Sequence, residues 1–225
     1  MNLNQLNEIA VKMVTPGQGL LAADESTGTI KKRFDTINTE STFEKRRDWR
    51  EMLFRTKNAM LNHVSGVILY DETLRQTSKD GTTLVELMLA NDTLPGIKVD
   101  MGAKPMAGNP GETVTEGLDG LRERLAEYYD LGARFAKWRA VINISTPNAE
   151  RMTPSWAAIK ANSHALARYA ALCQEANIVP IVEPEVIMDG CHSIERCETV
   201  TTQTLKTVFG DLYEQGVALE GIVLK

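Results

Sequence analysis

The chain has 225 residues, of which 43% are hydrophobic and 24% are charged, with a formal net charge of −5 at pH 7. This composition is typical of a globular protein with a large core, and it excludes intrinsic disorder. Without a Lys/Arg-rich run, the acidic chain offers no broad surface for nucleic acid or a membrane, so an anionic ligand would need a focused cationic pocket.

Six short apolar runs alternate with amphipathic helical segments along the chain. This alternation predicts β-strand and helix units around a parallel sheet, because parallel neighbours need a long crossover connection. In chain order, the predicted strands are residues 19–23, 66–70, 96–99, 135–142, 178–182 and 221–224.

Capping patterns predict where several of the intervening helices begin. The S/T-x-x-E box and a proline at the first helical position are the two start signals. They occur at Ser41 with Glu44, Thr83 with Glu86, Thr113 with Glu116, and Thr153-Pro154.

Helical spacing of apolar residues predicts which face of a helix packs on the core. In the helix that follows the first strand, this face consists of Trp49, Met52, Leu53 and Met60.

Charged residues occupy the carboxyl ends of most predicted strands, where a parallel strand buried on both faces is normally apolar. If the sheet closes into a (β/α)8 barrel, these side chains meet in its mouth, where enzymes of that fold carry their active sites. A doubly wound open sheet would place a ligand at one switch point and would not need charges on each strand, so we predict the barrel. The charged residues are Asp24, Lys98, Asp100, Lys137, Arg139, Glu183, Glu185 and Lys225.

Acids and amines in one mouth indicate proton-transfer chemistry on an anionic ligand. The three histidines lie on separate segments without H-x-H or H-E-x-x-H spacing, so we expect no metal site. The chain has neither a P-loop nor a G-x-S-x-G elbow, and nucleotide chemistry and acyl transfer therefore lack support.

Several segments at these strand ends carry a more specific signal. They are residues 20–28 (LLAADESTG), 66–74 (GVILYDETL), 96–100 (GIKVD), 117–121 (GLDGL), 135–139 (FAKWR), 178–185 (IVPIVEPE) and 219–225 (LEGIVLK). Together they resemble the class I fructose-bisphosphate aldolases, a metal-independent family that forms a Schiff base with its substrate. The resemblance implies a (β/α)8 barrel, usually a homotetramer, that reversibly cleaves fructose 1,6-bisphosphate to dihydroxyacetone phosphate and glyceraldehyde 3-phosphate. It implies no cofactor.

The same resemblance assigns the catalytic roles. Lys225 looks like the amine that forms an imine with the substrate ketone, and a protonated imine draws electrons from the neighbouring carbon–carbon bond. An ordinary lysine is almost entirely protonated at neutral pH, and Lys137 would favour the free amine of Lys225 through like-charge repulsion. Glu183 resembles the general acid and base. Glu185 and Asp24 would support proton movement, with Asp24 near the C4 hydroxyl.

A second set of residues resembles the family's ligands for the substrate phosphate and hydroxyl groups. Cationic side chains are the means by which an acidic protein holds a bisphosphate. For Arg33 and Arg46, a solvated helix face is the open alternative, and Thr29 stands where many members of the family carry Ser. The set is Lys98, Arg139, Ser26, Thr29, Arg33 and Arg46.

The resemblance covers residues 1–225 as a single domain, but eight strands with their helices take about 250 residues or more. We therefore expect the chain to supply about six strand–helix units of a barrel that is incomplete at its C-terminus, within a longer molecule.

The alternative functions are a non-catalytic scaffold or an inactive aldolase fragment, and zinc-dependent aldol cleavage. We expect a small-molecule sugar phosphate as substrate, with neither nucleic acid nor a membrane as partner. Three cysteines without a C-x-x-C pair indicate a reduced compartment, so we expect a cytoplasmic protein or a processed organelle form.

Overall fold

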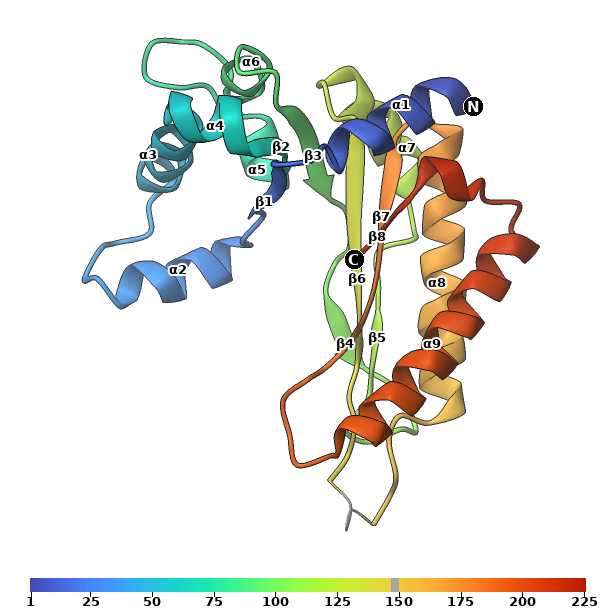
Figure 1. Cartoon of the computed structure of the whole chain (residues 1–225). Coiled ribbons are helices and arrows are strands. Elements are labelled where there is room, and N and C mark those ends of the chain that lie inside the picture. The colour runs from blue at the N-terminus through green and yellow to red at the C-terminus, as the bar shows by residue number, and fades with distance from the viewer. Residues whose placement is uncertain (147–149) are drawn as a thin grey trace.

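A computed structural model describes residues 1–146 and 150–225. Six parallel strands form the central sheet, in the spatial order β1-β2-β3-β6-β7-β8 (Figure 1). Each strand lies beside the one before it in this sheet, so the strand order never reverses and the doubly wound alternative is wrong. The sheet is an arc of a (β/α)8 barrel, as predicted. The strands are β1 (Gly19–Ala23), β2 (Val64–Leu69), β3 (Leu94–Lys98), β6 (Phe135–Ile142), β7 (Val179–Val186) and β8 (Val223–Leu224).

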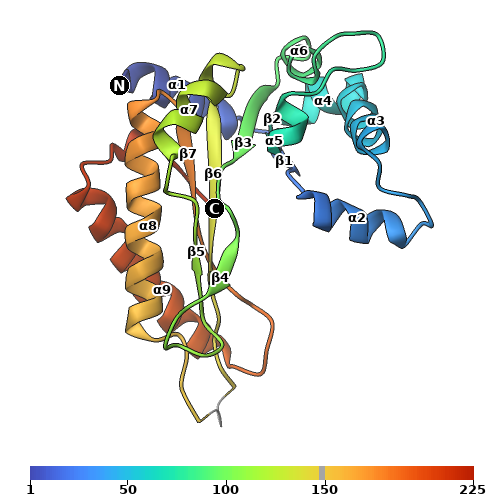
Figure 2. The same ribbon diagram turned by 180° about the vertical axis from the view of Figure 1, so that it is seen from behind.

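Helices cover the outer face of the sheet and one end of it. Figure 2 shows α8 lying along β6 and β7, with α9 beside it. A short 3-10 turn (Leu219–Gly221) precedes β8, which therefore begins later than predicted. In the described residues no helix is both long enough and apolar enough to span a bilayer. The helices are α1 (Leu3–Met13), α2 (Thr27–Asp35), α3 (Phe43–Phe54), α4 (Lys57–His63), α5 (Asp71–Leu74), α6 (Leu84–Leu89), α7 (Leu121–Asp130), α8 (Trp156–Glu175) and α9 (Ile194–Glu214).

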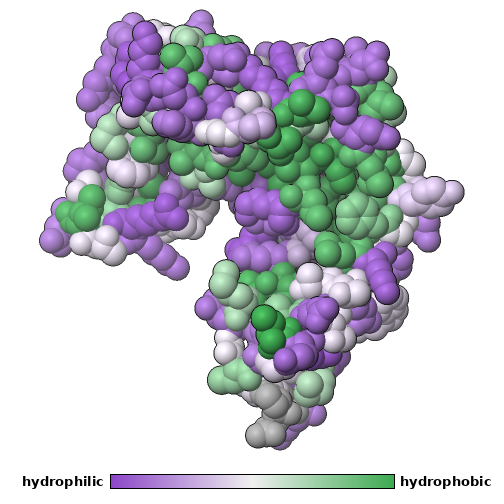
Figure 3. Space-filling model, in the orientation of Figure 1, coloured by the Kyte–Doolittle hydropathy of each residue, from purple (hydrophilic) through white to green (hydrophobic). Residues whose placement is uncertain are grey.

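The core lies on both faces of the sheet. On the outer face, Trp138 and Val182 are buried with side chains of the covering helices. On the inner face, Phe135 and Ile181 are buried with Leu6 of α1, so the first helix closes the end of the sheet from which the strands start. The space-filling view shows hydrophobic residues across the middle of the molecule on the side seen in Figure 1, with hydrophilic residues around them (Figure 3).

Two glycines make room for one aromatic ring on the inner face. A Cβ atom on Gly66 would lie 2.8 Å from Cε1 of Phe135, and a Cβ on Gly96 would overlap the same ring. Phe135 is fully buried. The ring of β6 therefore lies against the bare backbones of β2 and β3, which any side chain at these two positions would displace.

One of the predicted capping boxes is confirmed at the start of α6. The Thr83 hydroxyl accepts a hydrogen bond from the amide of Glu86 at 3.1 Å, and the Glu86 carboxylate accepts one from the amide of Thr83 at 2.8 Å. The box at Thr113 and Glu116 is wrong, because Thr113 lies in β5 (Thr113–Thr115), which pairs with β4 (Ala103–Pro105) in an antiparallel hairpin. The helix that follows, α7, begins after Gly120, whose left-handed φ of 66° suits glycine.

Two other predicted helix starts are displaced along the chain. Thr42, and not Ser41, caps α3, and its hydroxyl accepts from a backbone amide at 3.2 Å. At the start of α8 the cap is Ser155, so Pro154 lies before the helix and not at its first position. In both cases a neighbouring hydroxyl satisfies the free amides of the first turn, which the sequence pattern alone does not distinguish.

The apolar face predicted for α3 is wrong in part: Met60, which lies in α4, is buried in the core and Leu53 packs against it, whereas Trp49 and Met52 of α3 face outward. Trp49 and Met52 are 37% and 53% exposed, whereas Arg50 is fully buried and Arg46 is 8% exposed. Phe54 is the one apolar side chain among the buried residues of this helix. Apolar periodicity fails here because the buried face is built from charged side chains that meet carboxylates of other elements.

Candidate active site

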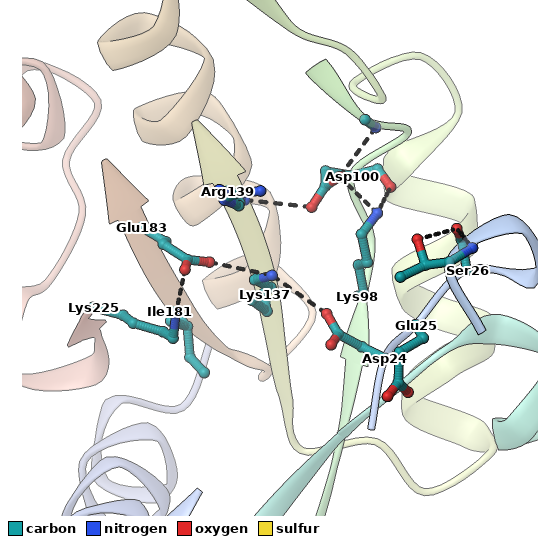
Figure 4. Close-up of polar contacts among 12 residues, drawn as sticks. Asp24, Glu25, Ser26, Lys98, Asp100, Lys137, Arg139, Ile181, Glu183 and Lys225 are labelled. Carbon is teal, nitrogen blue, oxygen red and sulfur yellow. Dashed lines mark hydrogen bonds and ion pairs between the residues drawn. The ribbon is translucent and has the colours of Figure 1, made fainter. Parts of the chain in front are cut away.

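The charged residues at the strand ends gather on the inner face, beyond its apolar half (Figure 4). Asp24 follows β1, Lys98 ends β3, and Lys137 and Glu183 lie within β6 and β7. Lys225 follows β8, and its backbone amide donates to the carbonyl of Val182 at 3.0 Å, which places it beside Glu183. The predicted convergence at the C-terminal ends of the strands is therefore present.

Four of these side chains form one row of alternating charge. The ammonium group of Lys225 donates to Oε1 of Glu183. Nζ of Lys137 lies 3.3 Å from Oε2 of Glu183 and 3.3 Å from Oδ2 of Asp24. Glu183 is thus shared between two amines, and its contact with Lys225 is a path along which a proton can pass.

The two lysines of this row differ in how far their side chains are buried. The side chain of Lys137 is 11% exposed and that of Lys225 is 50% exposed. Burial lowers the pKa of Lys137, but the charges of Asp24 and Glu183 outweigh it, and the net pKa of Lys137 is raised. Lys137 is therefore a cation at neutral pH, while Lys225 is the more exposed of the two amines; Lys137 lines a cavity beside this row, whereas Lys225 is not among its lining residues.

Asp100 organises the neighbouring strand ends. Its Oδ1 accepts from Nζ of Lys98 at 2.7 Å and from the amide of Gly102 at 3.0 Å. Its Oδ2 accepts from the amide of Arg139 at 3.3 Å. The guanidinium of Arg139 reaches outward to pair with Glu185 at the rim. In the described residues no three His, Cys, Asp or Glu side chains are arranged to bind a metal.

A cavity of about 810 Å³ opens beside this row, large enough for a small phosphorylated sugar. Its wall carries both acidic and basic groups, as the sequence predicts for a mouth that holds an anionic ligand. The lining includes Asp24, Glu25, Ser26, Thr29, Arg33, Lys98, Asp100, Arg124, Tyr128, Lys137 and Arg139.

The start of α2 forms part of the cavity wall. The hydroxyl of Ser26 accepts from the amide of Thr29 at 3.3 Å, so Ser26 caps the helix, and the two hydroxyls lie 3.1 Å apart. Arg33, one turn further, is 63% exposed and pairs with the buried carboxylate of Glu25. Free amides and a cation at a helix start favour an anion.

Arg46 differs from the other predicted ligands. It is not among the residues that line the cavity. Its Nε and Nη2 donate to the two carboxylate oxygens of Glu72 at 2.9 and 2.6 Å, and a third bond reaches the carbonyl of Ser41. The alternative of a solvated helix face is wrong for Arg46, because the side chain is 10% exposed.

Two residues at or beside the site, Arg50 and Tyr128, were not predicted from the sequence. The fully buried Arg50 donates to the carbonyl of Glu25 at 2.8 Å, and its four-residue spacing from Arg46 on one helix face was the available signal. The hydroxyl of Tyr128 donates to Asp71 at 2.9 Å beside the cavity. Burial, followed by the Asp71 carboxylate, raises the pKa of Tyr128.

Comparisons with known proteins identify the family to which the chain is similar. The family model described as fructose-bisphosphate aldolase class-I matches residues 5–225. The probable fructose-bisphosphate aldolase class 1 of Xanthomonas axonopodis pv. citri is 60% identical over 225 residues, which are 100% of this chain and 66% of that protein. The cytosolic fructose-bisphosphate aldolase 6 of Arabidopsis thaliana is 52% identical over 94% of this chain and 57% of its own length.

A solved structure shows the same fold. It is the fructose-bisphosphate aldolase of Plasmodium falciparum in a ternary complex with TRAP and a small-molecule inhibitor, with a TM-score of 0.93 and 47% identity. The alignment covers 99% of this chain and 63% of that one, so the chain spans less than two thirds of the length of these relatives. With a family match over nearly all of its residues, the chain belongs to the class I fructose-bisphosphate aldolase family.

Proposed function

We propose that the protein reversibly cleaves fructose 1,6-bisphosphate to dihydroxyacetone phosphate and glyceraldehyde 3-phosphate through an imine at Lys225. One observation carries the proposal: Lys225 shares the Glu183 carboxylate with the buried cation Lys137, at the mouth of a sheet of the aldolase family. A protonated imine is an electron sink, so the reaction proceeds without a metal or a cofactor.

In the first stage, Lys225 gives a proton to Glu183 and its free amine attacks the C2 carbonyl carbon, after which a proton moves from the nitrogen to the former carbonyl oxygen and gives the carbinolamine. Glu183, now in its acid form, protonates the hydroxyl group of the carbinolamine, which leaves as water and yields the protonated imine. Lys137 supports both steps, because its positive charge disfavours a second ammonium group nearby and stabilises the Glu183 carboxylate when the proton leaves it.

In the second stage, Asp24 accepts the proton of the C4 hydroxyl as the bond between C3 and C4 breaks. The electron pair of that bond moves to the protonated imine and leaves an enamine, and glyceraldehyde 3-phosphate departs. Protonation at C3 and hydrolysis release dihydroxyacetone phosphate and regenerate Lys225. Glu185, which pairs with Arg139 at the rim, supports this proton movement.

The cavity wall supplies the proposed contacts to phosphate and hydroxyl groups. The cations Lys98, Arg139 and Arg33 and the hydroxyls of Ser26 and Thr29 belong to this wall. Arg46 completes the set by family resemblance, but a contact from Arg46 to a phosphate requires that its bidentate pair with Glu72 opens.

We also propose that residues 1–225 belong to one domain, whose barrel is closed by further strands, and that it assembles as a cytoplasmic homotetramer. In the described residues β1 and β8 each have one neighbour, and the relatives are longer than this chain. Intact mass measured with sedimentation tests this. An active, monodisperse sample with the mass of one copy of these 225 residues contradicts it.

The activity is tested by following aldehyde release from fructose 1,6-bisphosphate in the presence of EDTA. We expect turnover that EDTA leaves unchanged, inactivation by borohydride only with dihydroxyacetone phosphate, and no turnover in Lys225→Met. Lys206→Met, an exposed change on α9, is the matched control and should remain active. Activity that EDTA abolishes supports zinc-dependent cleavage, and partner binding without any turnover supports the scaffold alternative.

A further inference from the structure

The turn from Asp24 to Ser26 joins β1 to α2 and carries three residues of the cavity wall. In the described residues β1 pairs on one side only, with β2, and this ladder ends at Ala23. Figure 1 shows α2 extending away from the sheet, beneath α3. The ladder with β2 therefore stops one residue before the turn, and side chains from other elements reach the turn.

Two side chains from distant parts of the chain reach this turn. Lys137 of β6 contacts the Asp24 carboxylate, and Arg50 of α3 donates from Nη2 to the backbone carbonyl of Glu25 at 2.8 Å. The Arg50 side chain is fully buried and is not among the residues that line the cavity. The side chain of Arg50 therefore contacts the backbone of the turn at Glu25 and does not enter the cavity.

The other contacts of Arg50 are charge interactions. Its guanidinium lies 3.7 Å from Oε2 of Glu25 and 3.7 Å from Oε1 of Glu72. Within the described residues, Nε and Nη1 have no hydrogen-bond partner. A buried ion pair is weak evidence for a role in stability, because removing charges from water costs about as much as their attraction returns. The one directed bond of this guanidinium goes to the turn.

We propose that Arg50 is a positioning residue, which holds the Glu25 carbonyl and thereby sets the Asp24 carboxylate and the Ser26 cap against the cavity. The inference rests on the function proposed above and deepens it. Its effect falls mainly on one half of the reaction, because cleavage of the carbon–carbon bond uses Asp24 directly, whereas imine formation uses Glu183 on β7 and Lys225 after β8, which connect to the turn indirectly, through Lys137. Lysine at position 50 keeps the charge but loses the planar donor fork.

The test compares Arg50→Lys with Arg55→Lys in the complete protein. Arg55 follows the same helix, is 41% exposed and pairs with Glu51 and Asp80 away from the cavity. Two reactions are measured for each variant: borohydride trapping of dihydroxyacetone phosphate, and kcat and KM for cleavage of fructose 1,6-bisphosphate. We expect Arg50→Lys to trap the imine as the wild type does and to lose about 10- to 100-fold in kcat/KM for cleavage, as misplacement of a reacting group does. Arg55→Lys should match the wild type in both.

A structural role would lower both reactions together, and equal loss of trapping and cleavage in a folded Arg50→Lys overturns the inference. So does unchanged cleavage. If thermal unfolding shows that Arg50→Lys is not folded, the variant Arg50→Met, which leaves Glu25 paired with Arg33 and Glu72 paired with Arg46, must show the same division between the two reactions. A wild-type protein that traps no imine refutes the proposed function, and this inference with it, whereas normal trapping with unaffected cleavage in Arg50→Lys refutes the inference alone.

Discussion

Replacing Lys137 by methionine removes the cation between two buried carboxylates and keeps the length of the side chain. Nζ lies 3.3 Å from both Asp24 and Glu183, whose side chains are 14% and 4% exposed. At that distance each pair of unit charges attracts by about 5 kcal/mol at an effective dielectric constant of about 20. Desolvation of the lysine offsets much of this attraction, and breaking a buried pair by removing one partner costs about 3–5 kcal/mol.

We expect Lys137→Met to lose about 3 kcal/mol of unfolding free energy, at the lower end of that range, because Glu183 still pairs with Lys225. Urea denaturation at pH 7 measures the loss. Since the pKa of Lys137 is raised above 10.5, its contribution is complete below that pH and is lost as the pH rises through the raised pKa. The difference between the two proteins should therefore persist through neutral pH and shrink only in strong alkali.

The exposed change Lys206→Met controls for the loss of a surface charge and should alter the unfolding free energy by less than about 0.5 kcal/mol. The reasoning is refuted if Lys137→Met is as stable as this control, or if the difference between Lys137→Met and the wild type grows in alkali. Either result would mean that Lys137 is not the charged link between the two acids.

Three further changes test other parts of the structure. Gly96→Ala should destabilise the fold by about 1–3 kcal/mol in urea denaturation, because the new Cβ overlaps the ring of Phe135. Adding Phe135→Leu to this variant should restore part of the loss, and a Gly96→Ala variant as stable as the wild type would contradict the packing. Tyr128→Phe removes a phenol whose pKa is raised by burial and by Asp71. The wild type should therefore lose stability relative to the variant as the pH rises above about 10. Parallel curves of unfolding free energy against pH for the two proteins would contradict this. Thr83→Ala should lower the thermal stability by about 1 kcal/mol through the lost capping box, whereas Thr83→Ser, which keeps the hydroxyl, should not.

The strands and their convergence follow from the sequence because they depend on local and periodic properties. Short apolar runs between helices give parallel strands, and alternation places Lys98, Lys137 and the residue after the last strand on one face. No knowledge of distant contacts is needed for this step. The pairing of Lys137 with both Asp24 and Glu183 required the register of the sheet, which the sequence does not specify.

The buried face of α3 does depend on distant contacts, and its prediction failed for Trp49 and Met52. Trp49 and Met52 match an apolar stripe, yet the helix buries Arg50 because Glu25 and Glu72 approach it from the ends of β1 and β2. The β4–β5 hairpin was missed for a related reason. Its strands are three residues long, and at this length alternation is indistinguishable from a loop or a helix start.

The central claim is that one particular amine forms the imine. The site has three lysines that could form an imine, Lys98, Lys137 and Lys225, and of these three only Lys225 combines half-exposure with a bond to Glu183. The direct measurement is to reduce the protein with borohydride in the presence of dihydroxyacetone phosphate, digest it, and locate the added mass by peptide sequencing in a mass spectrometer. We predict the adduct on Lys225. An adduct on Lys137 or Lys98, or none on any of the three, would contradict the account.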